Sequence, residues 1–226
     1  MKRMKITVAG LCLLTMVSCS TNQGTGSLIG AGGGAVLGGV LGQIIGKNGK
    51  STAIGAAIGA AVGTGAGTLI GRHMDKVKAK VQQQVSNATV EEVTDNNGLK
   101  AVKVTFDSGL QFELGKATLS SAAKTDLANF AKVLTNDTQL SVDIQGYTDA
   151  TGGDNINLPL SANRAKAVES YLKTQGVSAS QFKQVDGYGS QNPIVDAEVA
   201  PKNRRVEVYL YASEAMIKSA NNGTLN

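Results

Sequence analysis

Two charged residues near the middle of the chain have the chemistry to bind a charged ligand together. Asp149 follows the β-prone segment Ser141–Gln145, and Arg164 comes fifteen residues later, on a helical pattern. A carboxylate accepts hydrogen bonds from an ammonium group, and a guanidinium can hold a carboxylate through two parallel bonds. The pair would suit a ligand that carries both charges. The alternative interpretation is an exposed ion pair, which contributes only ~0–1 kcal/mol.

Residues suited to catalysis or metal binding are scarce in this chain. His73 is the single histidine, and the two cysteines, Cys12 and Cys19, both lie within the first twenty residues. An enzyme would need a nucleophile or a poised acid and base, and a metal site would need more than one lone histidine. We therefore expect no enzyme activity, metal or cofactor, and we interpret His73 as a solvated surface residue.

The net charge argues against a nucleic-acid partner. The formal charge is +5, but Lys2, Arg3 and Lys5 supply three of these charges in a segment without acidic residues. If that segment is a cleaved leader, the remaining chain carries +2 (5 − 3). So small an excess does not give the basic footprint that phosphate binding requires.

Strand and helix patterns alternate in the second half of the chain and would position the charged pair. The predicted strands cover 89–93, 99–106, 141–145, 182–185 and 205–210, and the predicted helices cover 119–134 and 161–175. Asp95-Asn96-Asn97-Gly98 predicts a hairpin turn between the first two strands. We predict an α+β fold for residues 89–213, a two-layer α/β sandwich. With its helix starting at Ser161, Arg164 would lie on the first turn, where free backbone N–H groups favour an anion.

Five motifs in this region, spread over about 100 residues and in the same order, resemble those of the OmpA-like family. They are Phe112-Glu113-x-x-x-Ala117-x-Leu119, Gly146-Tyr147-Thr148-Asp149, Asn157-x-x-Leu160-Ser161-x-x-Arg164-Ala165, Gly187-Tyr188-Gly189-x-x-x-Pro193 and Asn203-Arg204-Arg205-Val206. Two positions depart from the family pattern. Tyr147 stands where His is common, and Glu113 stands where Asp is usual.

The resemblance implies a binding function. Domains of this family bind the diaminopimelate side chain of peptidoglycan without breaking a bond, and diaminopimelate carries an ammonium and a carboxylate on one carbon. The candidate ligand-binding residues that it implies are Asp149, Arg164, Asn157, Thr148 and Glu113. Because neighbouring residues of a strand face opposite sides, at most one of Arg204 and Arg205 should face a shared site.

The first nineteen residues resemble a bacterial lipoprotein signal. A basic start is followed by the apolar run Ile6–Val17, which is too short to span a bilayer, and then by Ser18-Cys19. We predict a signal peptide over 1–18, lipidation of Cys19 and a lipidated tether over 19–26. Met16 stands where Leu is usual, and a plain signal peptide is the alternative. Three acyl chains would anchor the protein permanently. Ser20 instead of Asp after the cysteine favours the outer membrane, by resemblance to enterobacterial lipoproteins.

Ten glycines recur at a spacing of four residues between positions 30 and 71, in two runs of five separated by a short basic turn. This spacing places small residues in one row along a helix, and each glycine costs ~1 kcal/mol of helix stability unless helices approach closely. We predict a glycine-zipper helical hairpin over 27–71, similar to segments of envelope lipoproteins. A disordered linker, a compact soluble hairpin and an assembly interface are the alternatives.

The remaining segments complete the predicted organisation. Residues 72–88 are expected to form a linker or helix extension, and residues 214–226 a flexible C-terminal tail. The expected function is that of an outer-membrane lipoprotein which binds peptidoglycan and ties the membrane to the cell wall. The alternative is an envelope assembly protein that forms homo-oligomers through its glycine-zipper helices, with wall binding only positioning it.

Overall fold

The computed structural model describes residues 64–107, 112 and 115–225. These residues include every segment between 89 and 213 for which the sequence predicts a strand or a helix. The predicted signal peptide, Cys19, most of the glycine-striped hairpin and Glu113 lie outside them.

A mixed sheet of five strands forms one layer of the fold. Its strands are β1 (Ala88–Thr94), β2 (Lys100–Asp107), β3 (Leu140–Tyr147), β4 (Phe182–Gly187) and β5 (Arg205–Ala212), in the spatial order β1-β2-β5-β3-β4. Only β3 and β4 run parallel to each other. The predicted turn between β1 and β2 is present. Gly98 has a φ of 73°, and the Asp95 carboxylate accepts hydrogen bonds from the Asn97 and Leu99 amides. The predicted α+β fold is confirmed.

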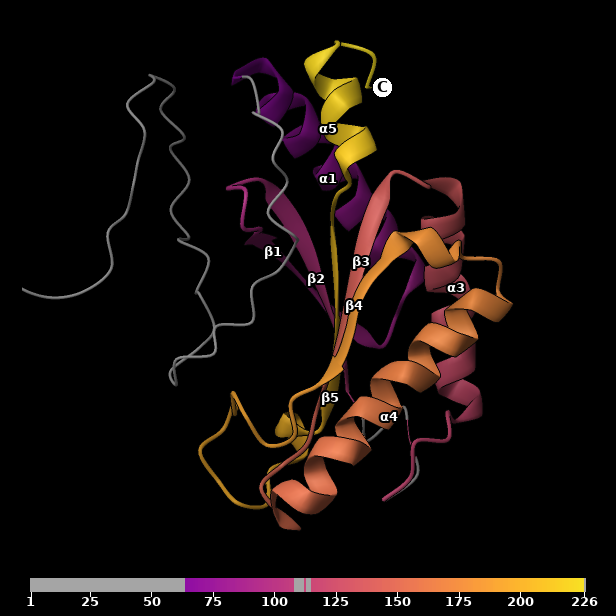
Figure 1. Cartoon of the computed structure of the whole chain (residues 1–226). Coiled ribbons are helices and arrows are strands. Elements are labelled where there is room, and N and C mark those ends of the chain that lie inside the picture. The colour runs from indigo at the N-terminus through magenta and orange to yellow at the C-terminus, as the bar shows by residue number, and fades with distance from the viewer. Residues whose placement is uncertain (1–63, 108–111, 113–114, 226) are drawn as a thin grey trace, which may run out of the picture. The chain divides into compact units, whose positions relative to one another are not determined.

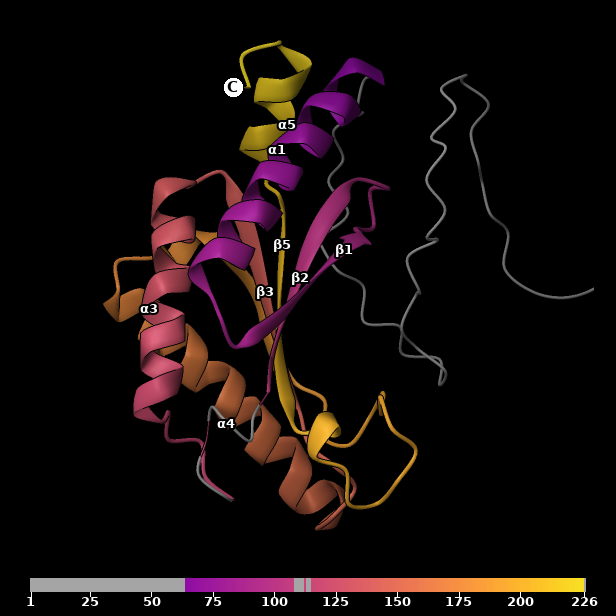
Figure 2. The same cartoon turned by 180° about the vertical axis from the view of Figure 1, so that it is seen from behind.

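Helices form the second layer. They are α1 (Thr64–Gln84), α3 (Ser121–Asn136), α4 (Gly153–Thr174) and α5 (Glu214–Asn221), with two short 3-10 turns, η1 (Ala179–Gln181) and η2 (Pro201–Asn203). Figure 1 and Figure 2 show α1, α3 and α4 side by side against the sheet. Alternate strand residues such as Ile144 and Val208 are fully buried in the core between the layers, where the Phe106 and Phe130 rings meet edge to face at 5.7 Å.

Helix α1 belongs to the domain instead of leading into it as a separate linker. Its apolar residues recur at spacings of three and four, and Ile70, Met74 and Val81 are completely buried. The predicted helix extension after Gly71 is therefore continuous as far as Gln84. The interpretation of His73 as a solvated residue was wrong, because its Nε2 lies 2.5 Å from the Asp137 carboxylate at the end of α3. No helix of the described residues is both long and apolar enough to cross a membrane.

Helix α4 begins eight residues before the predicted start at Ser161. It starts at Gly153, after Gly152 in the left-handed conformation, and carries Asp154 in its first turn, where an acidic side chain favours the helix dipole. The helix continues through Pro159. Arg164 therefore lies eleven residues inside the helix. The expectation that the free N–H groups of the helix start lie beside Arg164 was wrong.

The C-terminal residues form a helix where the sequence suggested a flexible tail. Ser213 caps α5 by accepting a hydrogen bond from the Met216 amide at 3.2 Å. Met216, Ile217 and Ala220 are buried, and α5 packs beside α1. The short apolar pattern was overlooked because the helix has only eight residues and its partner, α1, is distant in sequence.

Replacing Ile217 by Ala should lower the free energy of unfolding by about 2–5 kcal/mol, since a completely buried aliphatic side chain is lost and a cavity remains. Urea denaturation of the full-length protein measures this. Lys218→Ala on the exposed side of the same helix is the control and should change stability little. Equal, small effects of both substitutions would mean that α5 does not stabilise the domain.

Candidate ligand-binding site

The candidate site lies where β3 ends and β5 begins. Thr148 and Asp149 directly follow β3, and Arg204 directly precedes β5. These two strands are antiparallel neighbours, with Tyr147 opposite Arg205, so the end of one meets the start of the other. Arg164 reaches the same region from α4, which packs on β3 and β4. The fold thus brings together side chains that are up to 55 residues apart in sequence.

Two glycines let α4 approach the sheet closely enough to place Arg164. A Cβ atom at Gly146 would lie 2.1 Å from the carbonyl oxygen of Ser161, and one at Gly187 would lie 2.1 Å from the amide nitrogen of Ala162. Both neighbours are backbone atoms of α4, which cannot move aside as a flexible side chain could. The Ser161 hydroxyl reinforces the contact by accepting a hydrogen bond from the Gly189 amide at 2.9 Å. These glycines fix the helix three residues before Arg164.

Asp149 is held as a buried carboxylate. Its side chain is 4% exposed; Oδ2 accepts from Arg204 Nη1 at 2.8 Å, and Oδ1 accepts from the Thr151 hydroxyl at 2.5 Å. Burial raises the pKa of the carboxyl group, but the hydrogen bonds from Thr151 and Arg204 and the charge of Arg204 outweigh it and leave the pKa below its ordinary value. Each oxygen has a second lone pair, so the carboxylate can still accept from a ligand.

Arg164 is a buried guanidinium with spare hydrogen-bonding capacity. The residue is 3% exposed, its Nε donates to the Lys116 carbonyl oxygen at 3.1 Å, and its guanidinium carbon lies 5.2 Å from the centre of the Phe112 ring. Its buried Nη1 has no hydrogen-bond partner among the described residues. Burial and the nearby charge of Arg204 lower its pKa, whereas the charge of Asp149 raises it. Arg164, Arg204 and Asp149 are therefore close enough to interact.

The other residues suggested by the sequence have different roles in the structure. The buried Thr148 hydroxyl has no partner among the described residues, which leaves it available to a ligand. Asn157 is 2% exposed and uses its amide to donate to the Asp149 carbonyl oxygen at 3.1 Å, so it supports the turn that carries Asp149. Glu113 lies outside the described residues.

The sequence did not decide whether Arg204 or Arg205 belongs to the site, and the structure places Arg204 there. Arg204 contacts Asp149, whereas Arg205 points to the other face of the sheet and donates to Glu207 at 2.6 Å. The Asn203-Arg204-Arg205-Val206 motif marked both arginines, but the register of β5 decides which one faces Asp149.

The charges of the site suit a zwitterion. Asp149 offers one negative charge, and Arg164 and Arg204 offer two positive charges, of which Arg204 is already paired with Asp149. A carboxylate on the ligand would find the free Nη1 of Arg164, and an ammonium would find Asp149. The described residues contain no cluster of three or more His, Cys, Asp or Glu side chains that could hold a metal ion.

Comparison with known proteins places this geometry in a family. Residues 111–207 match the OmpA family, and residues 1–75 match the YMGG-like Gly-zipper. The chain carries an OmpA family domain. It is 36% identical over 141 residues to Probable lipoprotein YiaD of Escherichia coli, covering 61% of this chain and 63% of that protein. It is 51% identical over 70 residues to Peptidoglycan-binding protein ArfA of Mycobacterium tuberculosis, covering 30% of this chain and 21% of that protein. The chain thus matches less than two thirds of each relative.

Solved structures show the same fold at low sequence identity. A MotB-like protein of Desulfovibrio vulgaris superposes with a TM-score of 0.53 at 19% identity, covering 66% of this chain and 96% of that chain. The periplasmic domain of MotB from Helicobacter pylori gives a TM-score of 0.50 at 22% identity, with the same two coverages. The OmpA family is a non-enzymatic family, which agrees with the expected absence of catalysis.

Replacing Gly146 by Ala in the OmpA family domain should lower the free energy of unfolding by about 1–3 kcal/mol or more, because the new methyl group meets the α4 backbone. Gly65→Ala is the matched control, since a Cβ there meets nothing within 4 Å. Thermal denaturation should show a loss of stability only for the first substitution. Equal stability of the two variants would mean that the close contact of α4 with β3 is not needed.

Replacing Arg204 by Leu should raise the pKa of Asp149. The substitution removes the hydrogen bond and the positive charge that lower this pKa, whereas the burial that raises it remains. The carboxyl carbon of Asp149 can be titrated by ¹³C NMR in the wild-type protein and the variant. Lys76→Leu, which removes an equal charge from α1, should leave that pKa unchanged. An unshifted pKa in the Arg204 variant would show that this ion pair does not hold the carboxylate in its charged form.

Proposed function

We propose that the OmpA family domain of this chain binds the diaminopimelate of peptidoglycan without catalysis. The observation that carries the proposal is the Arg164 guanidinium, which is 3% exposed and has a buried Nη1 without a partner among the described residues. A buried charged donor left without an acceptor costs stability, and a ligand that accepts from it would remove this cost. A carboxylate is the acceptor whose geometry fits a guanidinium best.

The remaining groups of the site supply the other half of the recognition. Asp149 accepts from the ligand ammonium with the lone pairs that Thr151 and Arg204 leave unused. Arg204 keeps this carboxylate ionised and oriented. The free hydroxyl of Thr148 adds a neutral hydrogen bond to the ligand. A free amino acid head group meets both charges at once, whereas a simple cation or anion meets only one.

The relatives support a role at the cell envelope. One of them is named a lipoprotein and another a peptidoglycan-binding protein. We infer that Cys19 is acylated, that the chain is anchored in the outer membrane, and that the domain faces the periplasm. One acyl chain holds a protein only weakly, but several chains together hold it stably. The protein would then tie the membrane to the cell wall.

The position of α1 suits such a tether. The N-terminal end of α1 and the start of α4, which lies beside the candidate site, are at opposite ends of the domain in both views (Figure 1, Figure 2). The α1 helix of 21 residues is about 30 Å long at 1.5 Å per residue. The chain thus enters the domain at the end that is remote from the site, which leaves the site free to face the wall.

A second function, assembly of an envelope complex, is favoured by one observation. Gly67 and Gly71 continue the glycine stripe on α1, and a Cβ at either position would meet nothing within 4 Å. These two glycines are only partly buried, beside Ile70 and Met74, which are buried in the domain core. A second copy of the helix could approach these glycines closely. In that case wall binding would only position the complex.

Asp149→Asn and Arg164→Lys should each weaken binding of meso-diaminopimelate by about 2–5 kcal/mol. The first substitution removes the negative charge that the ligand ammonium would contact, and the second replaces the forked guanidinium by a single ammonium group. Calorimetric titration of the full-length protein in detergent measures the affinity, and cosedimentation with purified peptidoglycan measures wall binding. Circular dichroism verifies folding. Lys76→Met on α1 is the control for a lost charge. Undiminished binding by both site variants would reject the proposal.

A further inference from the structure

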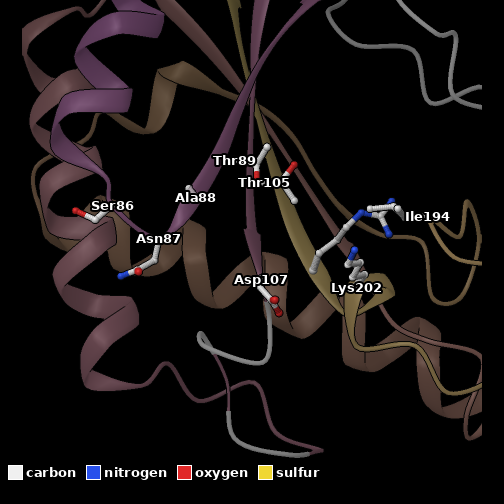
Figure 3. A pocket seen from close by; sticks show the side chains of 9 residues that line it. Ser86, Asn87, Ala88, Thr89, Thr105, Asp107, Ile194 and Lys202 are labelled. Atoms are coloured by element: carbon white, nitrogen blue, oxygen red, sulfur yellow. The ribbon is translucent and has the colours of Figure 1, made fainter.

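A cavity of about 520 Å³ opens on the face of the sheet that is turned away from the helices. Cross-strand partners share a face, and Phe106 and Val206 are paired and lie in the core. The residues that flank them, Thr105 on β2 and Arg205 on β5, therefore face the other side. Figure 3 shows Thr89 and Thr105 side by side on neighbouring strands, with Ile194 and Lys202 facing them from the loop between β4 and β5.

The polar groups of this cavity are largely uncommitted. Ser86, Thr89, Thr105 and Lys202 line it, and their side chains make no hydrogen bond or ion pair with other described residues. The hydroxyl groups of Thr89 and Thr105 and the ammonium group of Lys202 thus line one part of the cavity, whereas Ser86 lies apart from them (Figure 3). Its volume lies within the range of about 300–1,000 Å³ that is usual for small-molecule sites.

The charges around the cavity favour a neutral ligand. The Arg205 guanidinium is paired with the Glu207 carboxylate at 2.6 Å, and the two other charged lining residues, Asp107 and Lys202, carry opposite charges. Ile194 adds an apolar surface, since 58% of it is exposed. Hydroxyl groups beside an exposed aliphatic side chain match a ligand that carries hydroxyls, an amide and a methyl group. An N-acetylated sugar has these groups.

The cavity adjoins the diaminopimelate site through one short segment of chain. Arg204 contacts Asp149, and the next residue, Arg205, lines the cavity from the opposite face of the sheet. Successive Cα atoms are only about 3.8 Å apart. Lys202, two residues earlier, also lines the cavity. A ligand that passes around the start of β5 would therefore contact both places.

We propose that this cavity binds an N-acetylated sugar of the glycan strand whose peptide stem is held at Asp149 and Arg164. The inference rests on the proposed function and extends it, because the domain would then recognise sugar and stem of the same wall fragment. The hydroxyls of Thr89 and Thr105 bond the sugar, Ile194 contacts the acetamido methyl group, and Lys202 donates at the mouth of the cavity.

Three probes test this proposal by calorimetric titration of the full-length protein in detergent. They are the stem tripeptide that ends in diaminopimelate, the same tripeptide attached to its N-acetylglucosaminyl-N-acetylmuramic acid disaccharide, and the disaccharide alone. We expect the wild-type protein to bind the sugar-bearing peptide about tenfold more tightly than the bare peptide, since only the former can make hydrogen bonds in the cavity. Thr105→Val and Lys202→Met should remove this advantage and leave affinity for the bare peptide unchanged. Lys76→Met should alter neither affinity.

Equal affinity of the wild-type protein for the two peptides would overturn the sugar site, as would equal losses for both peptides in the Thr105 and Lys202 variants. Failure of the wild-type protein to bind either peptide would instead reject diaminopimelate recognition. In that event the disaccharide alone decides the matter. Binding that Lys202→Met weakens would support a sugar site, and absence of binding would overturn it.

Discussion

The candidate site depends on the close contact between α4 and the strands β3 and β4. A helix normally packs on a sheet through side chains, but here the backbone of α4 near Ser161 meets Gly146 and Gly187 without any side chain between them. A helix at ordinary distance would carry Arg164 away from Asp149. The contact brings a side chain from the middle of α4 beside the end of β3, and the Ser161 hydroxyl bonded to Gly189 keeps the loop after β4 in place.

The charged side chains of the site differ in whether they have a partner among the described residues. Asp149 and Arg204 form an ion pair, and the loss of Arg204 would leave the buried Asp149 carboxylate without its charged partner. Arg164 has no such partner at Nη1 among the described residues, and its burial lowers its pKa. Within the described residues, this leaves a buried donor without an acceptor, which stable cores rarely retain. An available donor of this kind supports the proposed binding role of Arg164.

The strands were predictable from the sequence, because each rests on a local pattern. Alternating polarity predicts strands wherever one face is buried, and the five predicted strands agree with β1 to β5 within a few residues. The start of α4 was predicted wrongly. Pro159 disfavours a helix locally, but α4 begins six residues before Pro159 and continues past it. The pairing of Arg204 with Asp149 and the packing of α5 on α1 depend on contacts between distant segments, which no local pattern contains.

Helix α1 carries the last two glycines of the stripe, Gly67 and Gly71, and packs on the domain. Ile70 and Met74 are completely buried, whereas Gly67 and Gly71 on the same helix meet nothing within 4 Å of an added Cβ. One continuous helix thus has a face that packs on the domain and a row of glycines that does not. The bond between His73 and Asp137 and the cover of α5 hold this helix to the domain along the same stretch. A load applied at the first turn of α1 would therefore reach the sheet through these contacts, which is what the proposed tether needs.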